Sequence, residues 1–258
     1  MSLIIDPWFY LVAIPGVLIV GIGKGGFAGG LGMLAVPIMA LTISPVQAAS
    51  IMLPILCVMD FTGLRAWIST WNNDLMWRLI PGALLGILAG YMAFEYVSDS
   101  TLKLLLGVIA IVFTLNHWSK RWRTVKPKGK VSSATDRVSA TFWSGLSGFT
   151  SFLAHAGAPP VMIYLLPKQL DKRLMVGTVT LFFAIVNYVK LVPYAALGLL
   201  DATNLGTSLV LSPLAVIGVK LGIYLHDKVD PVAFFRLMYL FLFATGVKLL
   251  IDGVAAWQ

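Results

Sequence analysis

The sequence predicts an all-α integral membrane protein, and three observations carry this prediction. Hydrophobic residues make up 59% of the chain and charged residues 12%, whereas about a quarter of the residues of a soluble domain are charged. Apolar stretches long enough to cross about 30 Å of hydrocarbon recur along the whole chain. The longest polar stretch, near residues 116–137, has only the length of a linker. We therefore expect residues 1–258 to form a single multi-pass membrane domain.

Apolar runs bounded by charged residues, proline or glycine divide the chain into about eight segments. They lie near residues 8–43, 46–67, 75–95, 101–118, 138–166, 173–194, 204–225 and 232–251. The first residues include one acid, Asp6, and neither lysine nor arginine. No cleavage-site pattern follows them, so we expect the N-terminus to remain as part of the first membrane segment.

The two halves of the chain share a pattern that predicts an internal repeat. PGALLGILAG, beginning at Pro81, matches PLAVIGVKLG, beginning at Pro213, in its proline and both glycines. GKGGF at Gly23 likewise matches GLSGF at Gly145. We expect two four-segment repeats, residues 8–118 and 138–251, joined by a basic loop at residues 119–137.

Each repeat is expected to open with a broken or re-entrant helix. Six of the ten residues in GKGGFAGGLG, residues 23–32, are glycine, and each glycine costs about 1 kcal/mol in a helix interior. In the second half, Pro159 and Pro160 follow Gly157. A proline pair cannot continue the hydrogen-bond ladder of a preceding helix, so the fifth segment should also be interrupted.

The distribution of charge predicts the orientation in the membrane. Seven of the basic residues lie in the 119–137 loop, and basic loops favour the cytoplasmic side. The net charge of +8 therefore does not indicate a nucleic-acid partner. If segments one and five enter and return, the basic residues near 65–78 and 168–173 also lie inside. Each half then crosses an odd number of times, which favours inverted repeats with both termini in the periplasm.

The first interruption predicts an anion site. Unwound backbone at membrane depth is tolerated only where it is buried or lines a cavity. We expect Lys24 and the amides of Gly25, Gly26, Gly29 and Gly30 to bind a small anion, because free N–H groups and an intramembrane cation both attract negative charge. The alternatives are close helix packing through the glycines and a Lys24 side chain that extends to the membrane surface.

The second interruption is expected to complete this site with His155, Ser151 and the amides around Gly157, although His155 could instead be a buried structural histidine. Asp60 lies inside the second segment and is a candidate for proton coupling, as is His155. An ion pair between Asp60 and Arg65 is the alternative.

Asn187 and Lys190 are rough counterparts of Asp60 and Arg65 in the second half, and Lys190 is expected to anchor at the membrane interface.

The remaining motifs do not indicate an enzyme. The string GLSG at residues 145–148 matches the GxSG string of rhomboid proteases, with Ser147 as nucleophile. Such a site needs a histidine on a neighbouring helix, and none is well placed. The chain has no GxxxxGK[ST] motif for direct ATP coupling, and we expect no catalytic residue, metal or cofactor.

The two interrupted segments resemble one known family. GKGGFAGGLGMLAVPIM from Gly23 and GFTSFLAHAGAPPVMIYLL from Gly148 resemble the TauE/SafE family of sulfite and organosulfonate exporters over nearly the whole chain. The resemblance implies a permease of the bacterial inner membrane that moves a small sulfur-containing anion, such as sulfite or sulfoacetate. The proton motive force is the expected energy source. An importer or channel-like uniporter for thiosulfate or another small anion is the alternative, and a homodimer stays open as the oligomeric state.

Overall fold

The computed structural model describes residues 3–27, 32–119, 133–226, 228 and 231–256. Within these ranges the chain is all-helical. The elements are α1 (Pro7–Gly26), η1 (Gly32–Leu34), α2 (Ala35–Met39), α3 (Pro45–Ala66), α4 (Asn73–Phe94), α5 (Asp99–Trp118), α6 (Ser133–Ala154), α7 (Ala158–Leu165), η3 (Leu166–Lys168), α8 (Lys172–Ala196), α9 (Ala202–Leu225) and α10 (Pro231–Ala255). Among the described residues, α1, α3, α4, α8 and α9 are long and apolar enough to cross a membrane. The predicted all-α, multi-pass class is confirmed.

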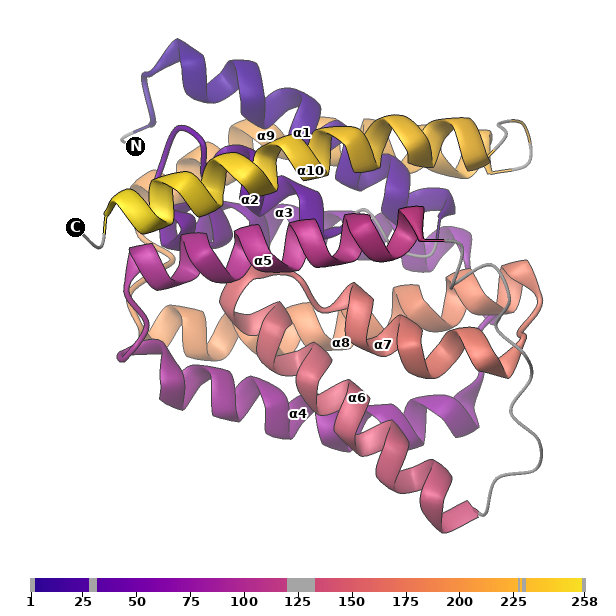
Figure 1. The fold of residues 1–258 in the computed structure, drawn as a ribbon. Helices are drawn as coiled ribbons and strands as arrows, with labels where there is room; N and C mark the ends of the chain where they lie inside the picture. Colours follow the sequence, from indigo (N-terminus) through magenta and orange to yellow (C-terminus); the bar gives the residue numbers. More distant parts are fainter. Residues whose placement is uncertain (1–2, 28–31, 120–132, 227, 229–230, 257–258) are drawn as a thin grey trace.

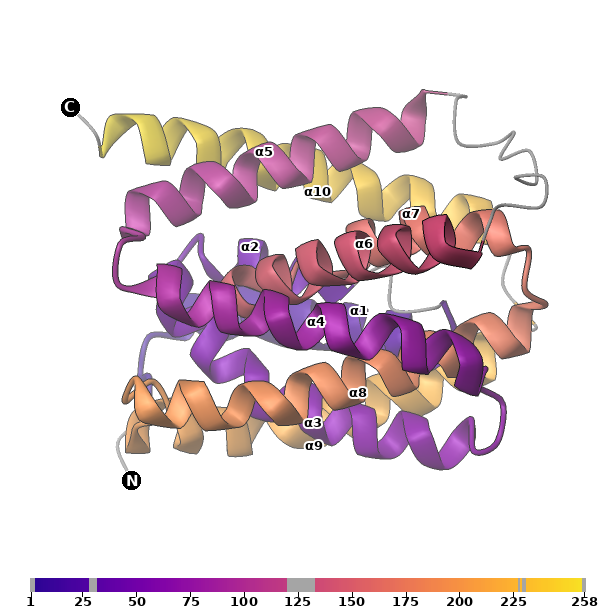
Figure 2. The ribbon, with the colours of Figure 1, turned by 90° about the horizontal axis from the view of Figure 1, so that it is seen from below.

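The long helices run back and forth between two sides of one bundle (Figures 1 and 2). The start of α1 and the end of α10 lie on the same side, which we call the terminal side. The end of α5 and the start of α6 lie on the other side, which we call the linker side. Helices α3, α5 and α9 run toward the linker side, and α4, α8 and α10 run back.

The first and fifth apolar segments are interrupted, as the glycine and proline patterns predicted. Helix α1 ends at Gly26, and the N–H of Phe27 donates to the carbonyl of Gly23. The described chain resumes at Gly32 with η1 and the short helix α2. Helix α6 ends at Ala154, and the chain turns back as α7 (Figure 1). Each half therefore opens with a broken helix.

The second interruption is stabilised by side chains from the helix that precedes it. His155 has φ of 52°, in the left-handed region that ends a helix. The hydroxyl of Ser147 donates to the carbonyl of Gly157 at 2.6 Å, and that of Thr150 donates to the carbonyl of Ala156 at 3.0 Å. These bonds satisfy buried carbonyls that the broken helix leaves without a backbone partner.

Two pairs of helices approach each other so closely that their contacts exclude a methyl group. A Cβ atom on Gly25 of α1 would lie 2.2 Å from the carbonyl oxygen of Val219 in α9. A Cβ atom on Gly86 of α4 would lie 1.9 Å from the carbonyl oxygen of Gly145 in α6. Small residues allow this backbone contact, which is a common way to hold helices together in lipid.

Ion pairs join three elements at the linker side. Asp136 in the first turn of α6 accepts from Arg78 of α4 at 2.8 Å and from the hydroxyl of Tyr164 of α7 at 3.1 Å. Lys168 at the end of η3 pairs with the other oxygen of the same carboxylate. The start of α6 is thereby tied to α4 and to the end of the α7 segment.

Candidate functional site

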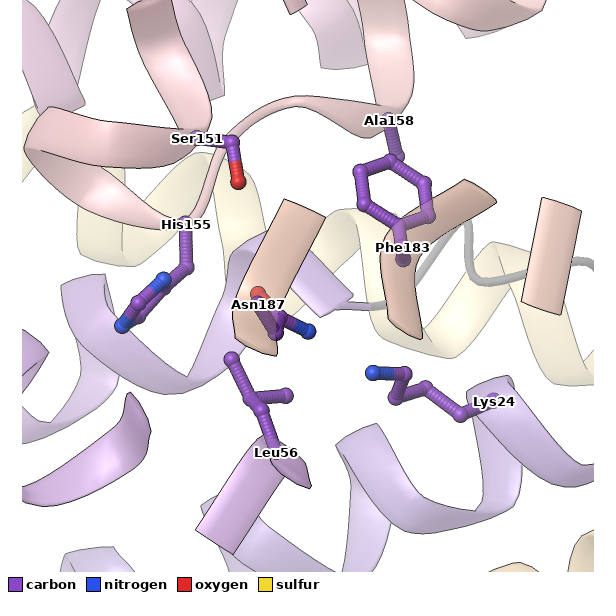
Figure 3. A pocket seen from close by; sticks show the side chains of 7 residues that line it. All are labelled: Lys24, Leu56, Ser151, His155, Ala158, Phe183 and Asn187. Atoms are coloured by element: carbon purple, nitrogen blue, oxygen red, sulfur yellow. The ribbon is translucent and has the colours of Figure 1, made fainter. Parts of the chain in front are cut away.

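A pocket lies in the interior of the bundle, where both interrupted segments meet α3 and α8 (Figure 3). It is lined by Lys24 of α1, Leu56 of α3, Ser151 and His155 at the end of α6, Ala158 of α7, and Phe183 and Asn187 of α8. It holds about 310 Å³ of empty space, its opening included. Side chains from both halves of the chain thus share one small, buried pocket.

A buried ion pair stands at one wall of the pocket. Lys24 forms a salt bridge with Asp60 of α3, and their side chains are 8% and 0% exposed. The side-chain amide of Asn187 donates to the other oxygen of Asp60 at 2.7 Å. Arg65, the partner considered from the sequence, instead places its guanidinium over the ring of Phe61, 4.6 Å from the centroid. Asp60 therefore pairs with Lys24 and not with Arg65.

A second buried lysine lies behind the pocket. Lys190 of α8 is fully buried and donates to the carbonyl of Ser151 at 2.8 Å and to the hydroxyl of Ser151 at 3.0 Å. Its third contact is Nδ1 of His155 at 2.7 Å. The expectation that Lys190 anchors at the membrane interface is wrong, because three partners from the end of α6 hold its ammonium group inside the protein.

The partners of His155 define its tautomer. Nε2 lies 2.9 Å from the carbonyl oxygen of Ala49, which can only accept, so Nε2 carries the hydrogen. Nδ1 then accepts from the ammonium of Lys190. This assignment, made from hydrogen-bond partners, describes a neutral imidazole that accepts from Lys190.

The buried ionisable side chains that the structure describes near the pocket include more lysines than carboxylates. Among the side chains whose burial the structure describes, the buried lysines are Lys24 and Lys190, and the one buried carboxylate is Asp60. A buried charge without a counter-ion is costly. An anion in the pocket would lie close to both lysines and would reduce that cost.

The residues predicted from the sequence fall into two groups. Lys24, Ser151 and His155 line one pocket, although they come from opposite halves of the chain (Figure 3). Gly157 is not among the lining residues, and a Cβ atom there would lie 2.7 Å from the carbonyl oxygen of Ser147. It is the residue that begins the return into α7.

The glycines of the first interruption lie elsewhere. Gly25 and Gly26 form the last turn of α1 and pack against α9. Their carbonyls accept hydrogen bonds from the indole of Trp67 and the imidazole of His226, respectively. Because the last turn of a helix presents free carbonyls rather than free N–H groups, this end of α1 does not supply the expected amide donors. Gly29 and Gly30 lie outside the described residues.

Two polar residues of the site carried a weak signal in the sequence. Asn187 and Lys190 are three residues apart, so they share one face of an otherwise apolar helix. A polar pair of this kind indicates a polar interior. Leu56, Ala158 and Phe183 carried no such signal, since apolar residues are the rule in these segments.

Ser147 does not form a protease site. Its hydroxyl donates to the carbonyl of Gly157, and His155 contacts Ala49 and Lys190. A serine nucleophile would instead need its hydroxyl bonded to a histidine base.

A multi-pass helical bundle in which two interrupted helices meet at a buried polar pocket is an arrangement that many membrane transporters share. The chain belongs to the sulfite exporter TauE/SafE family, whose family model matches residues 13–249. Members of this family are transporters and not enzymes. No curated protein and no solved structure matches the chain.

Proposed function

We propose that this transporter exports a small sulfur-containing anion, sulfite or an organosulfonate such as sulfoacetate, across the bacterial inner membrane. The proton motive force drives the export, and Asp60 and His155 are the candidates for proton coupling. Membership of the sulfite exporter family supports the substrate class. The observation that carries the assignment to this pocket is its set of ionisable groups, because two lysines and one aspartate are buried at or next to it.

Polar and apolar walls of the pocket suit an organosulfonate. Lys24 and Asn187 supply N–H donors, and Ser151 supplies a hydroxyl. Hydrogen bonds from a charged donor to anionic oxygens are about twice as strong as neutral ones. Leu56 and Phe183 supply apolar surface for the carbon atoms of the substrate. Lys190 acts from behind by holding Ser151 and His155 in place.

An inverted repeat is part of the same proposal, and the helix pairing supports it. Helix α1, which opens the first half, packs on α9, and α6, which opens the second half, packs on α4. Helices α3 and α8 pack on each other, and so do α5 and α10. A twofold axis between the halves would exchange the α1–α9 pair with the α6–α4 pair. It would also swap the two members of the α3–α8 pair and of the α5–α10 pair. The first half begins at the terminal side and ends at the linker side, and the second half begins at the linker side and ends at the terminal side (Figure 2), which agrees with such an axis.

Alternating access about this axis would open the pocket to one side of the membrane at a time. Arg78 and Lys168 lie at the linker side, and the basic segment 119–137 follows α5 and precedes α6 in the sequence. The linker side is therefore assigned to the cytoplasm. In the structure, Asp136 holds α4, α6 and the α7 segment together at that side. Breaking these ion pairs would be part of opening the pocket to the cytoplasm.

A ligand screen on the purified transporter tests the proposal. Thermal stability is measured with sulfite, thiosulfate, sulfoacetate and malonate, in which a carboxylate replaces the sulfonate of sulfoacetate. We expect sulfite or sulfoacetate to raise the melting temperature more than malonate, because a bound ligand stabilises the folded state by mass action. Stabilisation by cations or neutral solutes alone would overturn the proposal. Flux measurements in proteoliposomes then distinguish coupled export from import or channel-like passage.

A further inference from the structure

The pocket has two N–H donors, one from α1 and one from α8, and both are bound to the same carboxylate. This carboxylate is not among the residues that line the pocket. Lys24 and Asn187 line the pocket, and Asp60 does not. Lys24 pairs with one oxygen of Asp60, and the amide of Asn187 donates to the other at 2.7 Å. In the structure, Asp60 therefore occupies the same donors that an anion in the pocket would use.

An ionised Asp60 opposes the binding of an anion in two ways. It competes for the ammonium of Lys24 and the amide of Asn187, and its own charge repels a second negative charge nearby. Both effects are strong here, because Asp60 is fully buried and the interior screens charge poorly. A proton on Asp60 removes both effects at once.

We infer that the transporter binds its anion together with one proton, which Asp60 takes up as Lys24 and Asn187 turn from its carboxylate to the anion. This inference rests on the proposed function and adds the coupling to it. The protonated carboxyl becomes a hydrogen-bond donor, and the side chain of Asn187 can rotate to offer its oxygen as the acceptor. By linkage, the anion raises the affinity of Asp60 for the proton as much as the proton raises the affinity for the anion.

The other titratable groups near Asp60 are poorer candidates to take up this proton. Lys24 faces it from α1, Lys190 and Tyr188 lie toward it from α8, and Cys57 lies one turn earlier on α3. None of these groups is a second carboxylate. His155, which directly follows α6, has both ring nitrogens in contact, with Ala49 and Lys190, so a proton on Nδ1 would break the contact with Lys190.

The inference has a consequence for the driving force. Sulfoacetate is a dianion at neutral pH, so co-transport with one proton carries one net negative charge. A membrane potential that is negative inside, which is the electrical part of the proton motive force, drives this charge outward. A pH gradient that is acidic outside opposes this step, because the proton leaves with the anion. A monoanion that moves with one proton would be electrically neutral and would not respond to the potential.

Proton uptake on binding tests the inference directly. Sulfoacetate is added to the purified transporter in weakly buffered detergent solution, and the change in pH is followed with an indicator dye. Sulfoacetate is a suitable probe because its sulfonate and carboxylate both stay ionised above about pH 6. We expect uptake to approach about one proton per bound anion. The dissociation constant should rise by up to about tenfold per pH unit wherever Asp60 is ionised in the empty protein.

Two variants identify the group that takes the proton. Asp60→Asn should bind sulfoacetate without proton uptake and with an affinity that no longer depends on pH. Asp252→Asn is the matched control, because Asp252 also pairs with a lysine, Lys248, but at an exposed site on α10. It should take up protons as the parent does.

The outcomes separate this inference from the proposed function. Binding of sulfoacetate to the parent protein without proton uptake would overturn the inference and leave the proposed function standing. Full uptake by Asp60→Asn would also overturn it. If the parent binds none of the sulfur anions, the proposed function fails and the inference fails with it. If Asp60→Asn does not fold, proton uptake by the parent protein on binding sulfoacetate is the measurement that tests the inference.

Discussion

Replacing Lys24 with methionine should strongly destabilise the protein, because it leaves the charge of Asp60 buried beside a single amide donor. The side chain of Asp60 is 0% exposed, and its remaining described hydrogen-bond partner is Asn187. Removing one partner of a buried ion pair costs about 3–5 kcal/mol. We expect Lys24→Met to lower the free energy of unfolding by this amount, measured in mixed micelles by titration with a denaturing detergent.

The double variant Lys24→Met/Asp60→Asn should recover most of that stability. It removes both charges, and replacing a buried ion pair by neutral residues of similar volume is often close to neutral. It also removes the ammonium group from the pocket. The affinity for sulfoacetate should therefore stay at least about tenfold below that of the parent, which corresponds to about 1.5 kcal/mol for a hydrogen bond to a charged group.

Lys248→Met is the control for this cycle. Lys248 pairs with Asp252 across one helical turn, and its side chain is 59% exposed. An exposed pair contributes about 0–1 kcal/mol. The reasoning is refuted if Lys24→Met costs no more than Lys248→Met, or if the double variant is as unstable as Lys24→Met.

Two further predictions concern packing and topology. Gly86→Ala should lower the free energy of unfolding by about 1–3 kcal/mol, because its Cβ atom would meet the carbonyl of Gly145 at 1.9 Å. Gly16→Ala, whose Cβ atom would lie 3.6 Å from Ile38, should be neutral or stabilising in the same unfolding measurement; equal losses would contradict the packing argument. A reporter fused to the C-terminus should give a periplasmic signal and one inserted in residues 119–137 a cytoplasmic signal, and a cytoplasmic C-terminus would contradict the inverted arrangement.

The interruptions of the first and fifth segments could be predicted because their causes are local. Glycine density after Gly23 and the proline pair at Pro159 and Pro160 both act on the backbone within a turn or two. The exact end of the first break was less accessible. Helix α1 continues through Gly25 and Gly26 because contact with α9 compensates for the low helix propensity of glycine, and that contact joins residues about 200 positions apart.

The partner of Asp60 shows the limit of reasoning from spacing. Arg65 is the cation nearest to Asp60 in the sequence, but side chains five residues apart point to different faces of a helix, whereas those three or four apart share one. The actual partner, Lys24, comes from α1. A pairing between helices depends on how they pack, and the sequence of either helix alone does not determine it.

Lys190 was assigned to the wrong environment for a related reason. A lysine near the end of an apolar segment is usually an interface anchor. Here the end of α6 supplies three acceptors, two of them from Ser151, that satisfy the ammonium group inside the protein. The left-handed residue His155 turns the chain at this point and brings its imidazole to Lys190.

Sulfoacetate efflux from proteoliposomes tests the central claim most directly. The parent protein and Lys24→Met/Asp60→Asn are reconstituted at equal amounts, with labelled sulfoacetate inside and an imposed potential that is negative inside. We predict efflux above that of protein-free liposomes, faster with the potential than without it, and lost in the double variant. Parent protein that is folded yet moves no sulfur-containing anion, or a folded double variant that moves sulfoacetate as fast as the parent, would contradict the account.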